Sequence, residues 1–295
     1  MEKQIYLLGL LVSSLLVLLS CDSEDDVALP NPSTDLSLTL SGLEPLGAGY
    51  AYEGWVIVNG APVSTGTFTV NGTGQPSPAS FNILDETLDA ATMFVVSIEP
   101  VPDPDPAPAA TKVLAGPISN GSATLSTGIV GDFSGSNGTF FLRTPTDETD
   151  GNNGNDQYGV WFGDPGMPPT ANFSLPVLPA GWAYEGWVVG DSGPITTGTF
   201  TAFGMSDAAA PFSETAHAAP PIPGEDFFLN APAGETFPLD VRGRTVVISV
   251  EPVPDDSPAP FAMKPLLGTS GDATAPATHA LGTNLGSLPT GSISF

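Results

Sequence analysis

Basic side chains are scarce in this sequence. Its 295 residues include 6 lysines and arginines against 32 aspartates and glutamates, which gives a formal net charge of −26. Nucleic-acid binding is therefore excluded, because it needs basic side chains that displace counterions from phosphates. Anionic lipid head groups would also repel the chain unless a covalent anchor tied it to them. Long helices are excluded as well, because 34 glycines and 32 prolines are spread along the chain.

The sequence has a single cysteine, Cys21, so it can form neither an internal disulfide nor a thiolate metal site. Residues 5–19 before it form an apolar run that is too short for a spanning helix and typical of a signal peptide. The run ends in Leu-Leu-Ser-Cys at 18–21, which resembles a bacterial lipobox. We predict that residues 1–20 are a signal peptide and that Cys21 carries the lipid, palmitate included. An ordinary signal peptide or a membrane anchor with an incidental cysteine is the alternative.

Residues 21–34 are expected to form an acidic tether, which opens with Asp-Ser-Glu-Asp-Asp at 22–26. The tether resembles the acidic signals that send lipoproteins of some Gram-negative lineages to the cell surface. In other lineages an aspartate directly after the cysteine retains the protein at the inner membrane, and a plain solvated spacer fits too. We expect surface display at the outer membrane rather than the periplasmic face of the inner membrane.

The body of the chain is an internal duplication. Three segments recur: 51–56 as 183–188, 65–69 as 197–201, and 99–103 as 251–255. The first two are displaced by 132 residues and the third by 152, so the second copy has about 20 additional residues. We predict one unit at 35–145 and a second at 158–295. The acidic segment 146–157 between them is expected to be a linker or a loop.

The local patterns within each copy predict strands. Leu36, Leu38 and Leu40 alternate with polar residues, as in a half-buried strand. Residues 50–58 are apolar on both faces, which is typical of a central strand covered on both sides. Turn signals separate the short strands, and no helical period is present. The expected fold is all-β, with two tandem antiparallel β-sandwich domains of the immunoglobulin-like kind.

The repeated residues resemble those of a known family. The first copy carries four motifs: Tyr52-x-x-Trp55, Gly66-Thr67-Phe68, Ile98-Glu99-Pro100 and Leu114-Ala115-Gly116. The second copy repeats their main residues: Tyr184, Trp187, Gly198, Phe200, Glu251, Pro252, Leu266 and Gly268. In this order the motifs resemble the extracytoplasmic C-terminal domain of anti-sigma-K factors. Such regulators also have a cytoplasmic sigma-binding domain and a transmembrane helix. We do not expect either here, so any role in sigma-factor control would need a separate membrane partner.

Candidate chemistry is limited to carboxylates and aromatic rings. Glu53 with Glu99, and Glu185 with Glu251, could act as acid and base, but the favoured interpretation is that they bond to bulge or edge donors and at strand ends. Glu99 would then pair with Lys112. The repeated aromatic residues are interpreted as core, with an exposed sugar-binding platform as the alternative. The repeat-motif residues interpreted as structural are Tyr52, Glu53, Trp55, Phe68, Glu99, Tyr184, Glu185, Trp187, Phe200 and Glu251.

No catalytic set, cofactor or metal site is predicted. His217 and His279 occupy different places in the two copies, so the copies share no Ser-His-Asp set. Acidic side chains could hold a structural calcium ion, but a solvated loop is the favoured interpretation. These side chains are Asp103, Asp105, Asp147, Asp150, Asn152 and Asp156.

Three functional hypotheses remain open. The first is a non-catalytic, lipid-anchored envelope protein that serves as an interaction or structural module. The second is an envelope component of anti-sigma-type signalling, and the third is a carbohydrate-binding surface lipoprotein. The expected partners are the membrane, through the lipid, and an envelope protein of unknown identity.

Overall fold

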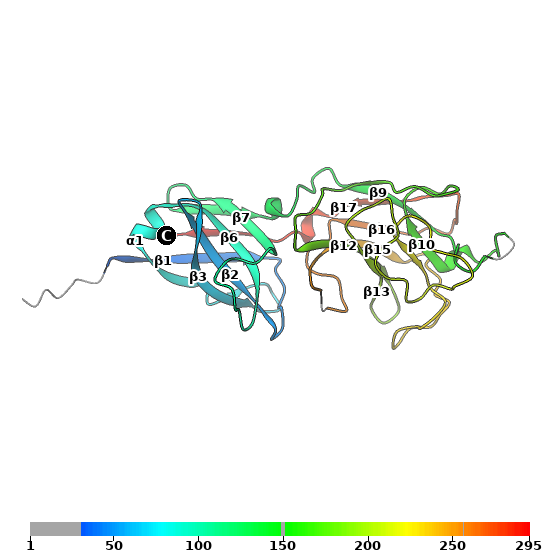
Figure 1. Cartoon of the computed structure of the whole chain (residues 1–295), viewed down its shortest axis with the longest axis horizontal. Coiled ribbons are helices and arrows are strands. Elements are labelled where there is room, and N and C mark those ends of the chain that lie inside the picture. The colour runs from blue at the N-terminus through cyan, green and yellow to red at the C-terminus, as the bar shows by residue number, and fades with distance from the viewer. Residues whose placement is uncertain (1–30, 149–150, 256) are drawn as a thin grey trace, which may run out of the picture. The chain divides into compact units, whose positions relative to one another are not determined.

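Antiparallel strands form nearly all of the regular secondary structure in the computed structural model, which describes residues 31–148, 151–255 and 257–295. The predicted signal peptide and Cys21 lie outside these ranges. Contacts group Pro32–Phe295 into one compact unit. Figure 1 shows its strands, and the all-β prediction with two tandem β domains is confirmed.

The first half of the chain contributes eight strands to the first sheet. They are β1 (Ser33–Ser41), β2 (Tyr50–Val58), β3 (Ala61–Val70), β4 (Pro76–Ser77), β5 (Ser80–Leu84), β6 (Ala91–Pro100), β7 (Lys112–Pro117) and β8 (Ser122–Ser126). A short helix, α1 (Asp85–Asp89), joins β5 to β6, and a 3-10 turn, η1 (Thr127–Ile129), follows β8. The ninth strand comes from the other end of the chain.

The second sheet also has nine strands. They are β9 (Asn137–Phe141), β10 (Gly159–Phe162), β11 (Phe173–Ser174), β12 (Trp182–Val189), β13 (Pro194–Phe200), β14 (Gly224–Asp226), β15 (Thr245–Pro252), β16 (Leu266–Thr269) and β17 (His279–Thr283). Two 3-10 turns, η2 (Asp156–Tyr158) and η3 (Leu285–Ser287), lie before β10 and after β17. The last strand, β18 (Thr290–Ser294), returns to the first sheet.

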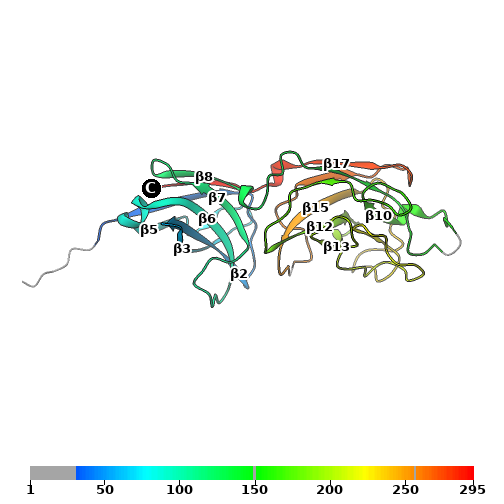
Figure 2. The same cartoon turned by 45° about the horizontal axis from the view of Figure 1, so that its top comes forward.

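The two halves exchange one strand. In the first sheet β18 lies between β8 and β1, where Ile293 pairs with Ala123 on one side and Leu38 on the other. In the second sheet β9 pairs with β17, with Leu281 opposite Gly138. Both views show the end marked C among the blue and cyan strands, and Figure 1 shows the green β9 beside β17 (Figures 1 and 2). Each sheet is therefore completed by a strand from the other half of the chain.

The cores explain the strand patterns in the sequence. The alternating leucines of β1 are all buried, whereas their neighbours Ser37 and Thr39 are exposed. Strands β2 and β12 are buried along most of their length, as expected for central strands covered on both faces. Aromatic rings fill the space between the edges of the first sheet, where Phe68 of β3 meets Phe81 of β5 at 6.2 Å between ring centroids.

The additional residues of the second copy form loops around β14. Asp207 closes the second sheet at this point, because its Oδ2 accepts a hydrogen bond of 2.9 Å from Gly224 N of β14. The same side chain lies against Gly198 of β13, where a Cβ atom would come within 2.8 Å of Asp207 Cγ. A buried carboxyl group thus joins the two edges that aromatic rings join in the first sheet.

The acidic segment between the predicted units packs where it is described. Thr146 is buried, and its backbone N and Oγ1 both donate to Asp226 Oδ2, at 2.9 and 2.5 Å. Asp156 is buried too and accepts a bond from Thr144 N. Hydrogen bonds thus replace the apolar contacts that this segment lacks.

The strand exchange makes Ile293 a sensitive position. Its side chain is buried in the core of the first sheet. We expect Ile293→Ala to lower the free energy of unfolding by about 2–5 kcal/mol. Hydrogen exchange should accelerate in β1 and β8, its neighbours, because the variant weakens their shared partner. Ser294→Ala, at the exposed next position, is the matched control. Faster exchange confined to the second sheet would contradict the exchanged pairing.

Candidate functional site

The repeated tryptophans anchor a buried polar chain in each copy. Trp55 Nε1 donates to Ser97 Oγ at 2.7 Å, and Ser97 Oγ donates in turn to Glu99 Oε1. Glu99 Oε1 also accepts a bond of 2.9 Å from Ala109 N. This series of hydrogen bonds therefore connects the central strand β2 to the end of β6 and to the loop that follows.

The second copy repeats this chain. Trp187 Nε1 donates to Ser249 Oγ at 2.7 Å, and Ser249 is hydrogen-bonded to Glu251. The carboxylate of Glu251 accepts from Phe261 N at 2.9 and 3.1 Å. Because the partners correspond pair by pair, the repeated Trp and Glu are explained by one hydrogen-bond network that forms twice.

The repeated tyrosines hold the entry to the central strands. Tyr52 Oη donates to Glu44 O at 2.8 Å, and Tyr184 Oη donates to Pro176 O at 2.6 Å. Each ring stacks on the phenylalanine of the neighbouring strand, with centroids 5.6 Å apart for Phe68 and 5.8 Å for Phe200. These four residues are buried parts of the core, as their interpretation as structural residues predicts.

Glu53 and Glu185 sit beside a β-bulge in each copy. The register shifts between Gly54 and Trp55, and again between Gly186 and Trp187. Ser64 Oγ donates to Glu53 Oε1, and the equivalent Thr196 Oγ1 donates to Glu185 Oε1. Each of these hydroxyl groups also accepts a bond from the backbone N of the glycine two residues further along its own strand. The two glutamates thus satisfy donors at an irregular point of the sheet.

The other expected partners of the motif residues differ in the structure. Lys112 Nζ donates to Ala109 O at 2.8 Å, and no ion pair with Glu99 occurs within the described residues. The aromatic residues considered for a sugar platform are buried, apart from Tyr50, which is half-buried. Both copies therefore use their motif aromatics in packing and offer no exposed stacking face there.

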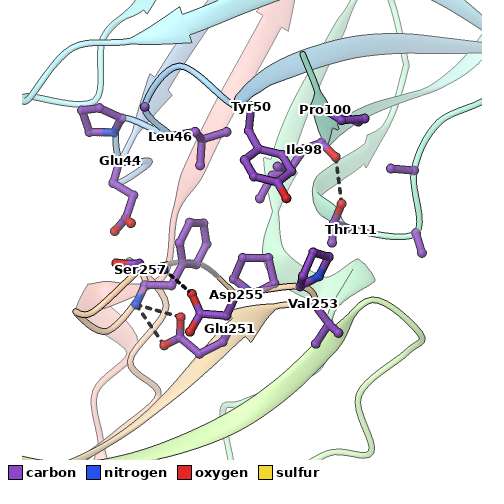
Figure 3. Close-up of a pocket in the computed structure, with 17 residues that line it drawn as sticks. Glu44, Leu46, Tyr50, Ile98, Pro100, Thr111, Glu251, Val253, Asp255 and Ser257 are labelled. Atoms are coloured by element: carbon purple, nitrogen blue, oxygen red, sulfur yellow. Dashed lines mark hydrogen bonds between the residues drawn. The ribbon is translucent and has the colours of Figure 1, made fainter. Parts of the chain in front are cut away.

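A cavity of about 550 Å³ lies against the second-copy motif (Figure 3). Leu46, Tyr50 and Val253 contribute apolar surface, and Glu44 and Asp255 contribute carboxylates. The floor includes Glu251, whose bonds from Phe261 N are drawn in Figure 3. The cavity thus combines apolar surface with acidic groups.

Two of the lining residues, Glu251 and Asp255, form a group with the carboxylate of Glu185 beside the cavity. One oxygen each of Glu185, Glu251 and Asp255 lies within 4.8 Å of the other two. Burial raises the pKa of Glu185 to about 7 and that of Glu251 to about 8, against hydrogen bonds that lower both. The sequence analysis paired Glu185 with Glu251 but missed Asp255 as their third member. The recurrence of Glu-Pro-Val-Pro-Asp at 251–255 was the signal that could have included it.

The acidic loops proposed for calcium are arranged differently. Asp103 and Asp105 each accept a bond from a backbone N two residues further on, at 2.9 and 3.0 Å. Asp147 and Asp156 bond to Asn155 and Asn152 in their own segment. Asp150 lies outside the described residues, and those that are described form no group of three metal-ligating side chains in these loops.

A second set of buried carboxyl groups belongs to the additional residues of the second copy. Desolvation raises the pKa of Glu225 to about 8 and those of Asp207 and Asp226 to about 7. Asp226 also accepts Trp161 Nε1 at 2.9 Å, and Glu225 accepts Ser213 Oγ. Sequence reasoning noted Glu225 and Asp226 only as part of the insertion, because acidic residues are rarely buried without a basic partner.

These groups predict how stability depends on pH. The pKa of Glu225 is higher in the folded chain than its ordinary value of 4.5, so the folded state binds more protons between pH 4.5 and about 8. The stabilisation is complete below the lower value and is lost as the pH rises through the upper one. We expect the melting temperature to fall over this range, and Glu225→Gln to reduce the fall.

The matched control is Glu86→Gln, an exposed residue. It should leave the slope of melting temperature against pH unchanged, because repulsion within the whole acidic chain is nearly the same in both variants. Equal slopes in the wild type and in Glu225→Gln would show that Glu225 is ionised in the fold.

Helices that could cross a membrane do not occur in the described ranges, since none is both long and apolar enough. The chain matches a family model described as "Anti-sigma-K factor rskA, C-terminal" over residues 26–118. No curated protein and no solved structure matches it. The match spans the first copy through the end of β7, which confirms the resemblance there. A second copy of that domain stays a prediction, supported by the repeated hydrogen bonds. Over residues 26–118, the chain is thus similar to an anti-sigma-factor extracytoplasmic domain.

Proposed function

We propose that the protein is a lipid-anchored, non-catalytic module of the bacterial cell envelope that binds another envelope protein. The family match supports an extracytoplasmic domain at residues 26–118. The lipobox at 18–21 supports an anchor at Cys21, whose acyl chains would hold the mature chain at the membrane. The acidic tether favours the outer surface of the outer membrane.

One observation carries the non-catalytic part of the proposal. The repeated glutamates bond to hydroxyl and backbone N–H groups of their own copy, in the same pattern twice. The motif is therefore best explained by the hydrogen bonds with which it holds the strands and loops. We assign the binding of a partner to the surface around them.

Anti-sigma-type signalling is a second candidate, favoured by the matched family model. The chain would then report on the envelope to a separate membrane partner. A deletion strain discriminates the two functions. An unchanged sigma-factor regulon supports the interaction module, whereas altered regulon transcripts that the wild-type gene restores support signalling.

The lipid anchor predicts a labelling result. Cells fed an alkyne palmitate should incorporate the label into the wild-type protein and not into Cys21→Ser, because the thioether and the new amino terminus both need Cys21. The variant should also leave the membrane fraction. Equal labelling of the two proteins, or none in either, contradicts the anchor.

The absence of catalysis predicts a second result. A hydrolase screen and a glycan array with the purified protein should give no hit that depends on Glu53 or Glu185. A turnover or glycan signal that Glu185→Gln abolishes, while the variant keeps the wild-type melting temperature, would instead assign an enzyme or a sugar-binding protein.

A further inference from the structure

The three grouped carboxylates, of which Glu251 and Asp255 line the cavity, come from two strands and one loop. Glu185 of β12 lies opposite Ser249 of β15, so Glu251, two residues further along, is on the same face of the sheet. Asp255 follows in the loop after β15, and Figure 3 shows it beside Glu251. The antiparallel register therefore fixes two of the groups, and the loop brings the third to them.

Each carboxylate is held in place by a donor. Thr196 Oγ1 donates to Glu185, Phe261 N to Glu251, and Ser257 N to Asp255 Oδ1 at 2.9 Å. Thr196 lies in β13, whereas Phe261 and Ser257 both belong to the loop after β15, so one strand and one loop hold the three carboxylates.

One of the remaining oxygens is buried without a partner. The Glu185 side chain belongs to a residue that is only 5% exposed, and its Oε2 accepts no hydrogen bond from the described residues. The carboxylates of Glu185 and Asp255 also approach each other closely. A buried acceptor that faces another carboxylate is costly unless a cation or a proton lies between them.

The negative net charge of the group favours the binding of a divalent cation. The three carboxylates carry up to three negative charges, and Lys264 is a base close enough to Glu251 for their charges to interact. Its Nζ is directed elsewhere, since it donates to Phe261 O at 2.6 Å. Ionised, the group would carry a net charge of about −2 with this lysine included.

We propose that Glu185, Glu251 and Asp255 bind a calcium ion. All three ligands are carboxylate oxygens, which hard cations prefer, and their spacing of up to 4.8 Å is about twice a Ca–O bond of roughly 2.4 Å. The cavity gives water access to the remaining coordination positions. With three protein ligands, the site falls in the affinity class of extracellular calcium modules, with Kd about 10⁻⁴–10⁻³ M.

The first copy provides an internal comparison. Glu53, Glu99 and Asp103 are its equivalent residues, but they form no such group among the described residues. Glu99 accepts bonds from a serine and from a loop N–H, as Glu251 does. Asp103 accepts a loop N–H as Asp255 does, so the copies differ in the approach of Asp255 to Glu185. The inference therefore concerns the second copy alone, and it goes beyond the proposed function because binding of an ion needs neither a partner nor an anchor.

The test is calcium titration of the full-length mature protein in detergent, after removal of divalent ions with EDTA. We expect saturable binding of one Ca²⁺ and a higher melting temperature in Ca²⁺ than in EDTA. Asp255→Asn should weaken binding by about tenfold or more, because it replaces a charged carboxylate ligand by a neutral amide oxygen at a partly exposed loop position that the core does not need. Glu53→Gln, the matched change in the first copy, should bind as the wild type does. Glu185→Gln should also lose binding.

Two results would overturn the site. One is no saturable heat and no change in melting temperature at concentrations tenfold above a Kd of about 10⁻³ M. The other is equal calcium binding by Asp255→Asn and the wild type. In both cases a proton shared by the carboxyl groups would account for their approach. Mg²⁺ should bind more weakly than Ca²⁺, because it is smaller and gives up its waters reluctantly.

Discussion

Buried carboxylates in this protein have almost no basic side chains to pair with, and their partners must be neutral donors. Serine and threonine hydroxyls, tryptophan N–H groups and backbone amides take this role at Glu99, Glu185 and Asp226. A neutral donor offsets only part of the cost of removing a carboxylate from water. The raised pKa values of these groups follow directly. Some of the bonds also join different elements, as those of Glu185 to β13 and of Asp226 to Trp161 do.

The repeated motif can be understood as one solution to this problem, used twice. Trp55 and Trp187 each bridge to a serine of the neighbouring strand, and that serine bridges to a glutamate. The two copies differ mainly in the carboxylate surroundings. In the first, Glu53 bonds to the neighbouring strand, and Glu99 and Asp103 bond within their own strand or the loop after it. In the second, Asp255 approaches Glu185, so that three carboxylates lie together beside the cavity. The first copy has no such group among the described residues.

The sequence was sufficient to predict strands, because burial on both faces of β2 and β12 leaves an apolar run that has no other explanation. Duplication likewise revealed which side chains act together, since Glu99 and Glu251 recur with their loops. The grouping of Asp255 with Glu185 depends on a loop conformation that local pattern does not encode. The same holds for Glu225 and Asp207, whose burial depends on contacts with distant strands.

The strand exchange was also beyond sequence reasoning. The segments Gly-Thr-Phe-Phe at 138–141 and Gly-Ser-Ile-Ser at 291–294 have the same alternation, and main-chain hydrogen bonds do not depend on which copy supplies them. By alternation and main-chain hydrogen bonding alone, either segment could complete either sheet. Only the three-dimensional pairing distinguishes them.

That exchange imposes an order on biosynthesis. A ribosome would complete strands β1 to β8 long before residues 290–294 leave the exit tunnel, and during export the first sheet would wait with two unsatisfied edges. The nascent chain therefore needs its last strand before its first domain is finished. The same open edge would accept β18 from a neighbouring molecule, which makes intermolecular swapping the characteristic misfolding route of this protein.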